Sequence, residues 1–177
     1  MNAHKATITS IFDGTTLIEI PFFQRSYVWD KYLWERFLND MEFTVKTKSP
    51  HFLGTLIFKD NGTPKSSEPY STQLLLIDGQ QRLTTYLIFL KVLCLKLGQS
   101  LTFDSHRFPD TNDLSLQHGK NDRPAFEKVM GMTAPVSITD DFSKSRVVQA
   151  YNFFVESLDT SKLNYTTIVG KTHFVRI

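Results

Sequence analysis

The sequence predicts an α/β (α+β) protein in which a small mixed sheet is flanked by helices. Short apolar runs alternate with longer segments of helical periodicity, which predicts both kinds of element in one chain. The second half is mainly helical in its pattern, so we expect a helical annex to the sheet. At 177 residues the chain is long enough for one domain with a sizeable core, or for one domain and a small annex.

Periodicity and turn residues divide the chain into eight expected elements. In chain order they are a strand at 15–20, a helix at 30–41, strands at 51–58 and 74–77, helices at 83–97, 124–130 and 143–158, and a strand at 173–177. Two stretches rich in turn-forming residues, 59–69 and 101–123, are expected to be loops. We therefore expect a core at 1–100 and a loop and helical continuation of the same domain at 101–177.

The first strand and the first helix have clear boundary signals. Pro21 closes the run at 15–20, because proline cannot extend the hydrogen-bond ladder of a strand. Asp30 is the expected N-cap of the helix that follows, in which the apolar residues form one stripe. The members of that stripe are Leu33, Trp34, Phe37, Leu38 and Met41.

The later elements are predicted from the same helical and strand periodicities of apolar residues. The strand at 51–58 contains Gly54, and the four consecutive apolar residues at 74–77 indicate a strand buried on both faces. Gly98 ends the helix at 83–97. The last strand stops at the final residue. Because an edge strand normally leads to another element, we expect that the protein continues beyond this chain.

Composition excludes several classes of protein. The net charge of +2 is spread evenly, so a nucleotide or nucleic-acid site must be local and no basic tail is present. A single cysteine excludes an internal disulfide framework and a cysteine-cluster zinc site. No apolar run is long enough to span a bilayer, and the first residues lack the apolar region of a signal peptide. We expect a cytoplasmic protein that does not bind membranes.

The strand, turn and helix at 74–97 carry most of the chemistry. The strand delivers the run DGQQR, residues 78–82, onto the first turn of a helix, where unpaired N–H groups and the helix dipole attract an anion such as phosphate. The candidate phosphate-binding residues are Gly79, Arg82, Thr84 and Thr85. Gln80 and Gln81 are able to position a water molecule or a base edge. Asp78 would repel a phosphate unless it caps the helix, binds a metal or acts as a base. In the competing interpretation Asp78 is only the N-cap, Gly79 a turn residue and Arg82 a surface charge.

A second candidate segment is the aromatic run at 20–29. After Pro21 it keeps several aromatic residues around Gln24 and Arg25, a combination that suits stacking on a base together with a phosphate contact. The candidate contacts are Phe23, Gln24, Arg25 and Tyr27. Alternatively, Phe22, Phe23 and Trp29 pack under the following helix as a hydrophobic staple. Most of the 15 phenylalanines are expected in the core.

Taken together in order, three runs resemble a known family. PFFQRSYVW at 21–29, HFLGTLI at 51–57 and LIDGQQRLTT at 76–85 are similar to the DGQQR-containing N-terminal domain of GmrSD-type modification-dependent (type IV) restriction proteins. Similar domains occur in the SspE and BrxU phage-defence proteins. The resemblance is strong over 15–97 and continues weakly through 145–151.

This resemblance implies a ParB/sulfiredoxin-like fold and the binding and hydrolysis of a nucleoside triphosphate, GTP or ATP, with Mg²⁺. Carried over, the motif falls on Asp78, Gly79, Gln80, Gln81 and Arg82, with Gln24 and Arg25 lining the same pocket. Asp78 would bind the metal-bound water or act as general base. Family members usually add an HNH-type nuclease domain, which this chain lacks, so we expect truncation before it or a nuclease partner subunit.

Three functions therefore compete. The first is a nucleotide-binding and NTP-hydrolysing sensor domain of a DNA-defence restriction protein that acts on modified DNA. The second is a DNA-binding, modification-sensing module without catalysis. The third is a nuclease in its own right, for which acidic residues would have to come near the pocket. Those acids are Asp110, Asp113, Asp140 and Asp141.

Overall fold

The computed structural model describes residues 2–62, 70–99 and 116–177, and within these ranges it confirms an α+β architecture. Six strands of the described chain form one mixed sheet in the order β1-β6-β3-β4-β2-β5. They are β1 (His4–Ala6), β2 (Thr16–Glu19), β3 (His51–Asp60), β4 (Thr72–Asp78), β5 (Leu116–Gln117) and β6 (Thr172–Arg176).

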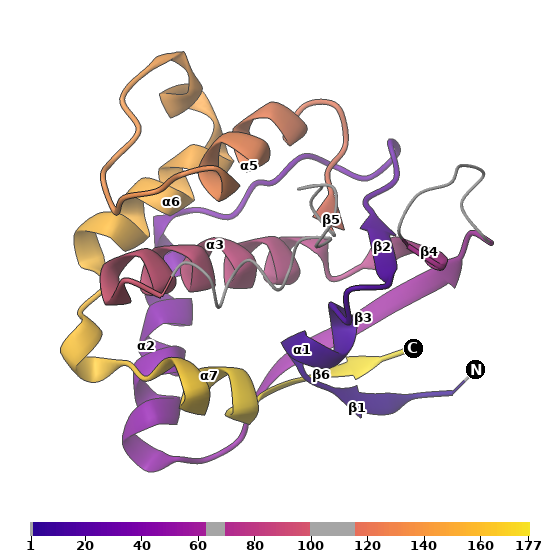
Figure 1. Ribbon diagram of the computed structural model, residues 1–177, viewed down its shortest axis with the longest axis horizontal. Helices are drawn as coiled ribbons and strands as arrows, with labels where there is room; N and C mark the ends of the chain where they lie inside the picture. The colour runs from indigo at the N-terminus through magenta and orange to yellow at the C-terminus, as the bar shows by residue number, and fades with distance from the viewer. Residues whose placement is uncertain (1, 63–69, 100–115) are drawn as a thin grey trace.

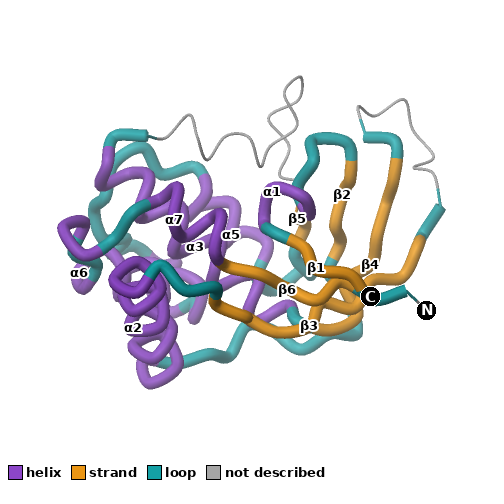
Figure 2. The backbone as a smooth tube through the Cα atoms, turned by 90° about the horizontal axis from the view of Figure 1, so that it is seen from below, coloured by secondary structure: helices purple, strands orange, loops and turns teal. Residues whose placement is uncertain are grey.

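The longer helices gather at one side of the molecule and the strands at the other, where the short helix at 8–11 also lies (Figures 1 and 2). Short 3₁₀ turns, η1 (Asp141–Lys144) and η2 (Thr160–Lys162), precede α6 and α7. The helices of the described chain are α1 (Ile8–Ile11), α2 (Lys31–Thr47), α3 (Gln80–Leu97), α5 (Arg123–Met130), α6 (Arg146–Ser157) and α7 (Tyr165–Lys171).

Helix α3 is the centre of the core. Every side chain from Leu83 to Leu95 is buried, because α3 packs between the sheet and the helices α5, α6 and α7. The sequence indicates one apolar stripe, but a helix covered on all sides is apolar all round. The rings of Phe37, Phe89 and Phe154 meet edge to face around α3, with centroids 5.3 to 6.1 Å apart. Much of the phenylalanine excess is therefore core, as expected.

Three parallel strands place three loops at one edge of the sheet. β2 pairs in parallel with both β4 and β5, so the carboxyl ends of all three strands point the same way. The segments that follow them are 20–29, 78–82 and 118–122. In sheets of this kind the crevice beyond the carboxyl ends is the usual position of a ligand site.

The predicted elements that rest on local signals are confirmed to within a few residues. Asp30 caps α2 by accepting a hydrogen bond from the Leu33 amide at 3.3 Å, as expected. The helix expected at 143–158 begins instead at Arg146, after η1. Of the two expected loops, residues 63–69 and 100–115 lie outside the described part of the chain.

Several expectations are wrong because they depend on distant pairing. The N-terminus contains β1, which pairs antiparallel with β6 from His4 opposite Arg176 to Ala6 opposite Phe174. Strand β6 is therefore an inner strand and not an edge strand. β4 is buried on one face only, at Leu74 and Leu76. The expected loop at 101–123 contains β5, which pairs with β2.

Burial of His118 makes the stability of the fold depend on pH. Its ring lies 4.4 Å from that of Phe126, and its Nε2 is 3.2 Å from the hydroxyl of Thr84. Burial, together with the nearby charge of Arg123, lowers the pKa of His118 to about 3. The unfolded chain takes up the proton near pH 6.5 whereas the folded chain does not, so stability is lost as the pH falls from about 6.5 toward 3.

We expect the free energy of unfolding to fall by about 2 kcal/mol between pH 7.5 and pH 5 through His118 alone. Urea titrations at both pH values measure this difference for the wild type and for His118→Gln, whose amide can still pair with Thr84. The substitution should remove most of the pH-dependent loss. The same substitution at the exposed His4 is the matched control, and an equal loss in wild type and His118→Gln would contradict the assignment.

Candidate functional site

A polar cavity of about 150 Å³ lies where β4 passes into α3. It joins the two segments that the sequence analysis selected, and its lining consists of Gln24, Arg25, Trp29, Asp78, Gly79, Gln80, Gln81 and Arg82. The strand–turn–helix geometry is as expected, but Asp78 is not the N-cap. Gly79 is the cap residue, with a φ of 96°, and no side chain caps the helix. The first amides of α3 therefore remain able to bind an anion at the positive end of the helix.

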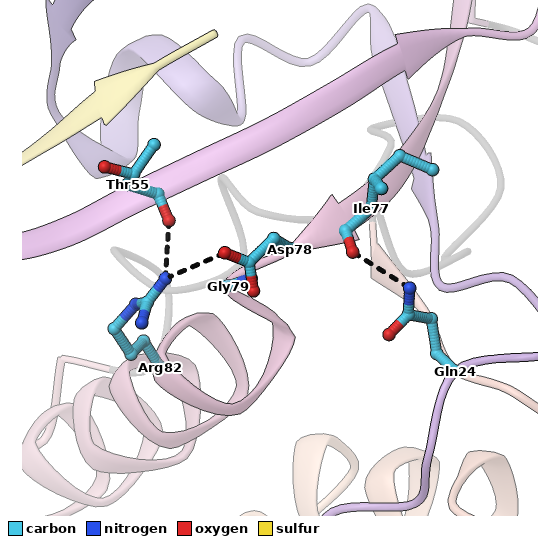
Figure 3. A network of polar contacts seen from close by, with 6 residues as sticks. All are labelled: Gln24, Thr55, Ile77, Asp78, Gly79 and Arg82. Atoms are coloured by element: carbon cyan, nitrogen blue, oxygen red, sulfur yellow. Dashed lines mark hydrogen bonds and ion pairs between the residues drawn. The ribbon is translucent and has the colours of Figure 1, made fainter.

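The guanidinium of Arg82 lies between two acceptors (Figure 3). Its Nη2 donates to the carbonyl of Thr55 at 2.6 Å and is 3.8 Å from a carboxylate oxygen of Asp78. The other Asp78 oxygen accepts from the Gly79 amide at 2.8 Å, and the Asp78 side chain is 63% exposed. Because this ion pair is open to water, it orients the two groups more than it stabilises the fold. Both remain available to a ligand.

Two glycines make room for Arg82. A Cβ atom on Gly54, whose φ is 130°, would stand 2.8 Å from Nε of Arg82. A Cβ atom on Gly79 would collide with Leu56 and stand 2.8 Å from the Thr55 carbonyl. Gly54 also lies where the pairing of β3 with β6 shifts register. The glycine inside the predicted strand is thus explained by the close approach of an arginine from α3.

The glutamines of the motif fasten the aromatic segment to α3. Gln81 accepts from the Val28 amide at 2.9 Å and donates to the Ser26 carbonyl at 3.2 Å. Gln80 donates to the Arg25 carbonyl at 2.9 Å. In the reverse direction, Gln24 donates to the carbonyl of Ile77 in β4 at 2.9 Å (Figure 3). The two motifs that the sequence analysis selected are therefore held together by side-chain amides.

The expected base contact at Tyr27 is wrong, because this ring is only 4% exposed. Its hydroxyl continues a buried chain of hydrogen bonds. Nε1 of Trp34 donates to the Tyr27 hydroxyl at 2.8 Å, this hydroxyl lies 2.6 Å from that of Thr85, and Thr85 donates to the Gln81 carbonyl at 2.8 Å. Burial raises the pKa of Tyr27, so the hydroxyl stays protonated and able to donate.

The aromatic residues before Tyr27 behave differently. Phe22 is 92% and Phe23 63% exposed, with their rings edge to face at 5.5 Å. They do not form the hydrophobic staple that was the alternative, whereas Trp29 is half-buried and packs against the core. Arg25 is exposed, and its guanidinium has no hydrogen bond or ion pair with any residue of the described ranges. It is a cation at the cavity, and no side chain in the described part of the protein neutralises it.

Two predicted phosphate contacts lie inside the fold. Thr84 and Thr85 are buried by α3 packing, and their hydroxyls bond to His118 and Gln81. Neither lines the cavity. Conversely, two features of the site are not predicted from the sequence: the carbonyl of Thr55 and the turn at 118–122. Asp122 holds this turn against the aromatic segment, because its carboxylate accepts a hydrogen bond from the Tyr27 backbone amide at 2.7 Å. Every residue has a backbone carbonyl, so no residue type indicates which carbonyl takes part in a site. The turn follows β5, a strand of only two residues, whose pattern is too short to predict.

Among the described residues, no further acidic group joins Asp78 to form a metal or nuclease centre at this cavity. No three His, Cys, Asp or Glu residues of the described chain are grouped so that they could hold a metal ion. Asp140 caps η1 and pairs with Lys128 at 3.4 Å, while Asp110 and Asp113 lie outside the described residues. Within the described ranges, no helix combines the length and the apolar character needed to cross a membrane.

The fold and the cavity define an α+β domain with a polar cavity beyond the carboxyl ends of its parallel strands. Residues 8–177 match the family described as the GmrSD restriction endonuclease, N-terminal domain, and the chain belongs to this family. Membership implies a role in a restriction system, with DNA and a nuclease domain involved. No curated protein matches the sequence.

Removal of the Tyr27 hydroxyl tests the buried chain of hydrogen bonds. We expect Tyr27→Phe to lower the free energy of unfolding by about 1–3 kcal/mol, because Trp34 and Thr85 lose a buried partner. Tyr32→Phe, on the exposed side of α2, should change it by less than about 0.5 kcal/mol. Equilibrium urea unfolding measures both, and equal effects would contradict the role assigned to Tyr27.

A methyl group at Gly54 tests the close approach of Arg82. We expect Gly54→Ala to lower the free energy of unfolding by about 1–3 kcal/mol, since alanine is strained at this positive φ and its Cβ would displace the guanidinium. Gly170→Ala in α7, where nothing lies within 4 Å, is the matched control and should be neutral or stabilising. Thermal or urea unfolding distinguishes the two, and a neutral Gly54→Ala would refute the packing argument.

Proposed function

We propose that this chain binds a nucleoside triphosphate, GTP or ATP, with Mg²⁺ and hydrolyses it, as the nucleotide-dependent sensing part of a restriction system that acts on modified DNA. The observation that carries the proposal is the cavity at the start of α3. There the first amides of α3, which no side chain caps, line one space with the guanidinium of Arg82 and with that of Arg25, which has no partner among the described residues. These are the donors that bind phosphate groups in proteins.

Asp78 is the residue that would allow the site to hydrolyse a bound nucleotide and not only to bind its phosphates. Its carboxylate is exposed, and one of its oxygens lies beside Arg82, which offsets the repulsion from a phosphate. Mg²⁺ is usually held by one or two carboxylates plus phosphate oxygens and water, so a single aspartate fits this ion. When bound, the metal would neutralise charge on the phosphates and hold the attacking water. Asp78 would then hold the metal or accept a proton from that water.

The glutamines fit a positioning role better than a direct one. Both ends of the Gln81 amide bond to the backbone of the aromatic segment, and the nitrogen of Gln80 does the same. Both ends of the Gln81 amide are already bonded and the residue is only 8% exposed, so it is poorly placed to orient water. Their contribution to hydrolysis would be to hold Arg25 beside the first turn of α3.

A single set of assays tests binding and turnover. Calorimetry and phosphate release are measured with GTP, ATP and CTP, with and without Mg²⁺, on the 177-residue chain. We expect Arg25→Ala to weaken nucleotide binding at least 10-fold while unfolding stays unchanged, because its exposed guanidinium bonds to none of the described residues. Asp78→Asn should keep most of the affinity and lower phosphate release about 100-fold or more, on the scale of lost acid–base or metal assistance.

Lys46→Ala, which removes an exposed charge in the last turn of α2, is the control and should alter neither measurement. Unchanged turnover in both site variants would refute the assignment. Salt-dependent DNA binding without nucleotide binding would favour the second candidate function, a modification-sensing module, for which the exposed Phe22 and Phe23 are the supporting observation.

A further inference from the structure

A second cavity adjoins the first along the same sheet edge. It has a volume of about 260 Å³ and lies between the aromatic segment and the turn at 118–122 that follows β5. Gln24 and Arg25 line both cavities, so a molecule with phosphates at α3 can continue past Arg25 into this space. Its size is close to the lower end of small-molecule sites, about 300 Å³.

The walls of this second cavity combine one open aromatic face with polar groups. Phe22 lines it while 92% exposed, and the edge-on contact with Phe23 restrains its ring. Exposed phenylalanine rings are costly in water and are used elsewhere as platforms on which bases stack. The turn at 118–122 contributes Lys120, which donates hydrogen bonds, and Asn121, whose side-chain amide both donates and accepts them, as base edges require.

The turn that carries these polar groups is fixed to the aromatic segment. The Asp122 carboxylate accepts a hydrogen bond from the Tyr27 backbone amide at 2.7 Å. The side-chain nitrogen Nδ2 of Asn121 is 3.5 Å from the Ser26 hydroxyl. The Asp122 and Arg123 amides both bond to the Gly119 carbonyl, at 3.2 and 3.0 Å, which closes the turn. Both walls are therefore preorganised relative to the phosphate cavity.

We propose that Phe22 and the turn at 118–122 form the nucleobase subsite of this chain. The base of the nucleotide stacks on Phe22 and meets Asn121 with its polar edge, while the phosphates lie at the start of α3. This inference rests on the proposed nucleotide binding and adds to it the residues that hold the base. The source of the base is a free nucleotide, because the two cavities share Gln24 and Arg25.

The test compares a ligand with a base and one without. Calorimetry with ATP, GTP and inorganic triphosphate is carried out on the wild type, Phe22→Ala and Phe22→Trp. Stacking on one aromatic ring contributes enough that Phe22→Ala should weaken nucleotide binding about 10-fold, whereas inorganic triphosphate should bind equally well to all three proteins. Phe22→Trp should restore the nucleotide affinity. Phe43→Ala, an exposed phenylalanine of α2, is the control and should change neither affinity.

Each outcome separates this inference from the proposed function. If inorganic triphosphate binds and Phe22→Ala leaves nucleotide binding unchanged, the base subsite is refuted and the phosphate site stands. If the wild type binds neither ligand, the proposed function fails and the base subsite fails with it. A single-stranded hexanucleotide forms the third arm. If Phe22→Ala weakens only its binding, the base belongs to DNA and the inference is overturned.

Discussion

The candidate site depends on the amide hydrogen bonds that hold the aromatic segment against the first turn of α3. Gln81 engages two backbone groups of that segment and Gln80 a third, while Gln24 bonds back to β4. A buried amide that lost such partners would cost more than an ordinary hydrogen bond contributes, so the arrangement tolerates few alternatives. It determines where Arg25 lies, and it keeps Tyr27 in the core while Phe22 remains in water.

The position of the Arg82 side chain depends on two glycines, whose lack of a side chain leaves the space around it open. A side chain at Gly54 would collide with the guanidinium of Arg82, and one at Gly79 would collide with Leu56 and crowd the Thr55 carbonyl to which Arg82 donates. Gly54 lies inside β3, whereas Gly79 lies in the turn before α3. Two residues far apart in the sequence therefore leave space around one arginine side chain. Gly54 also lies where the register of β3 with β6 shifts, and the carbonyl of the next residue, Thr55, points toward Arg82 of α3 (Figure 3).

Local signals predicted the strand, turn and helix at DGQQR and the cap of α2, because those depend on neighbours within a few residues. Pairing between His4 and Arg176 could not be predicted, since nothing at either end specifies a partner so far along the chain. The aromatic segment shows the same limit at a finer scale. Phe23 and Tyr27 are equivalent candidates for stacking in the sequence, yet Phe23 is exposed whereas the Tyr27 hydroxyl has buried hydrogen-bond partners and its ring lies in the core. Membership of the restriction family was reached from the residues, whereas the roles of the glutamines were not.

The net charge of +2 says little about the cavity, because an anion there is attracted by the few charged groups that lie close to it. Charges beyond about 10 Å are screened in physiological salt, so an anion entering the cavity responds to Arg25, Arg82 and the helix terminus and not to the whole chain. Of the two arginines, Arg82 already has a carbonyl and a carboxylate as partners, while Arg25 has none among the described residues. Binding an anion therefore costs no internal contact at Arg25 and requires some rearrangement at Arg82. It follows that affinity should depend mainly on Arg25, and that Arg82 should mainly position Asp78.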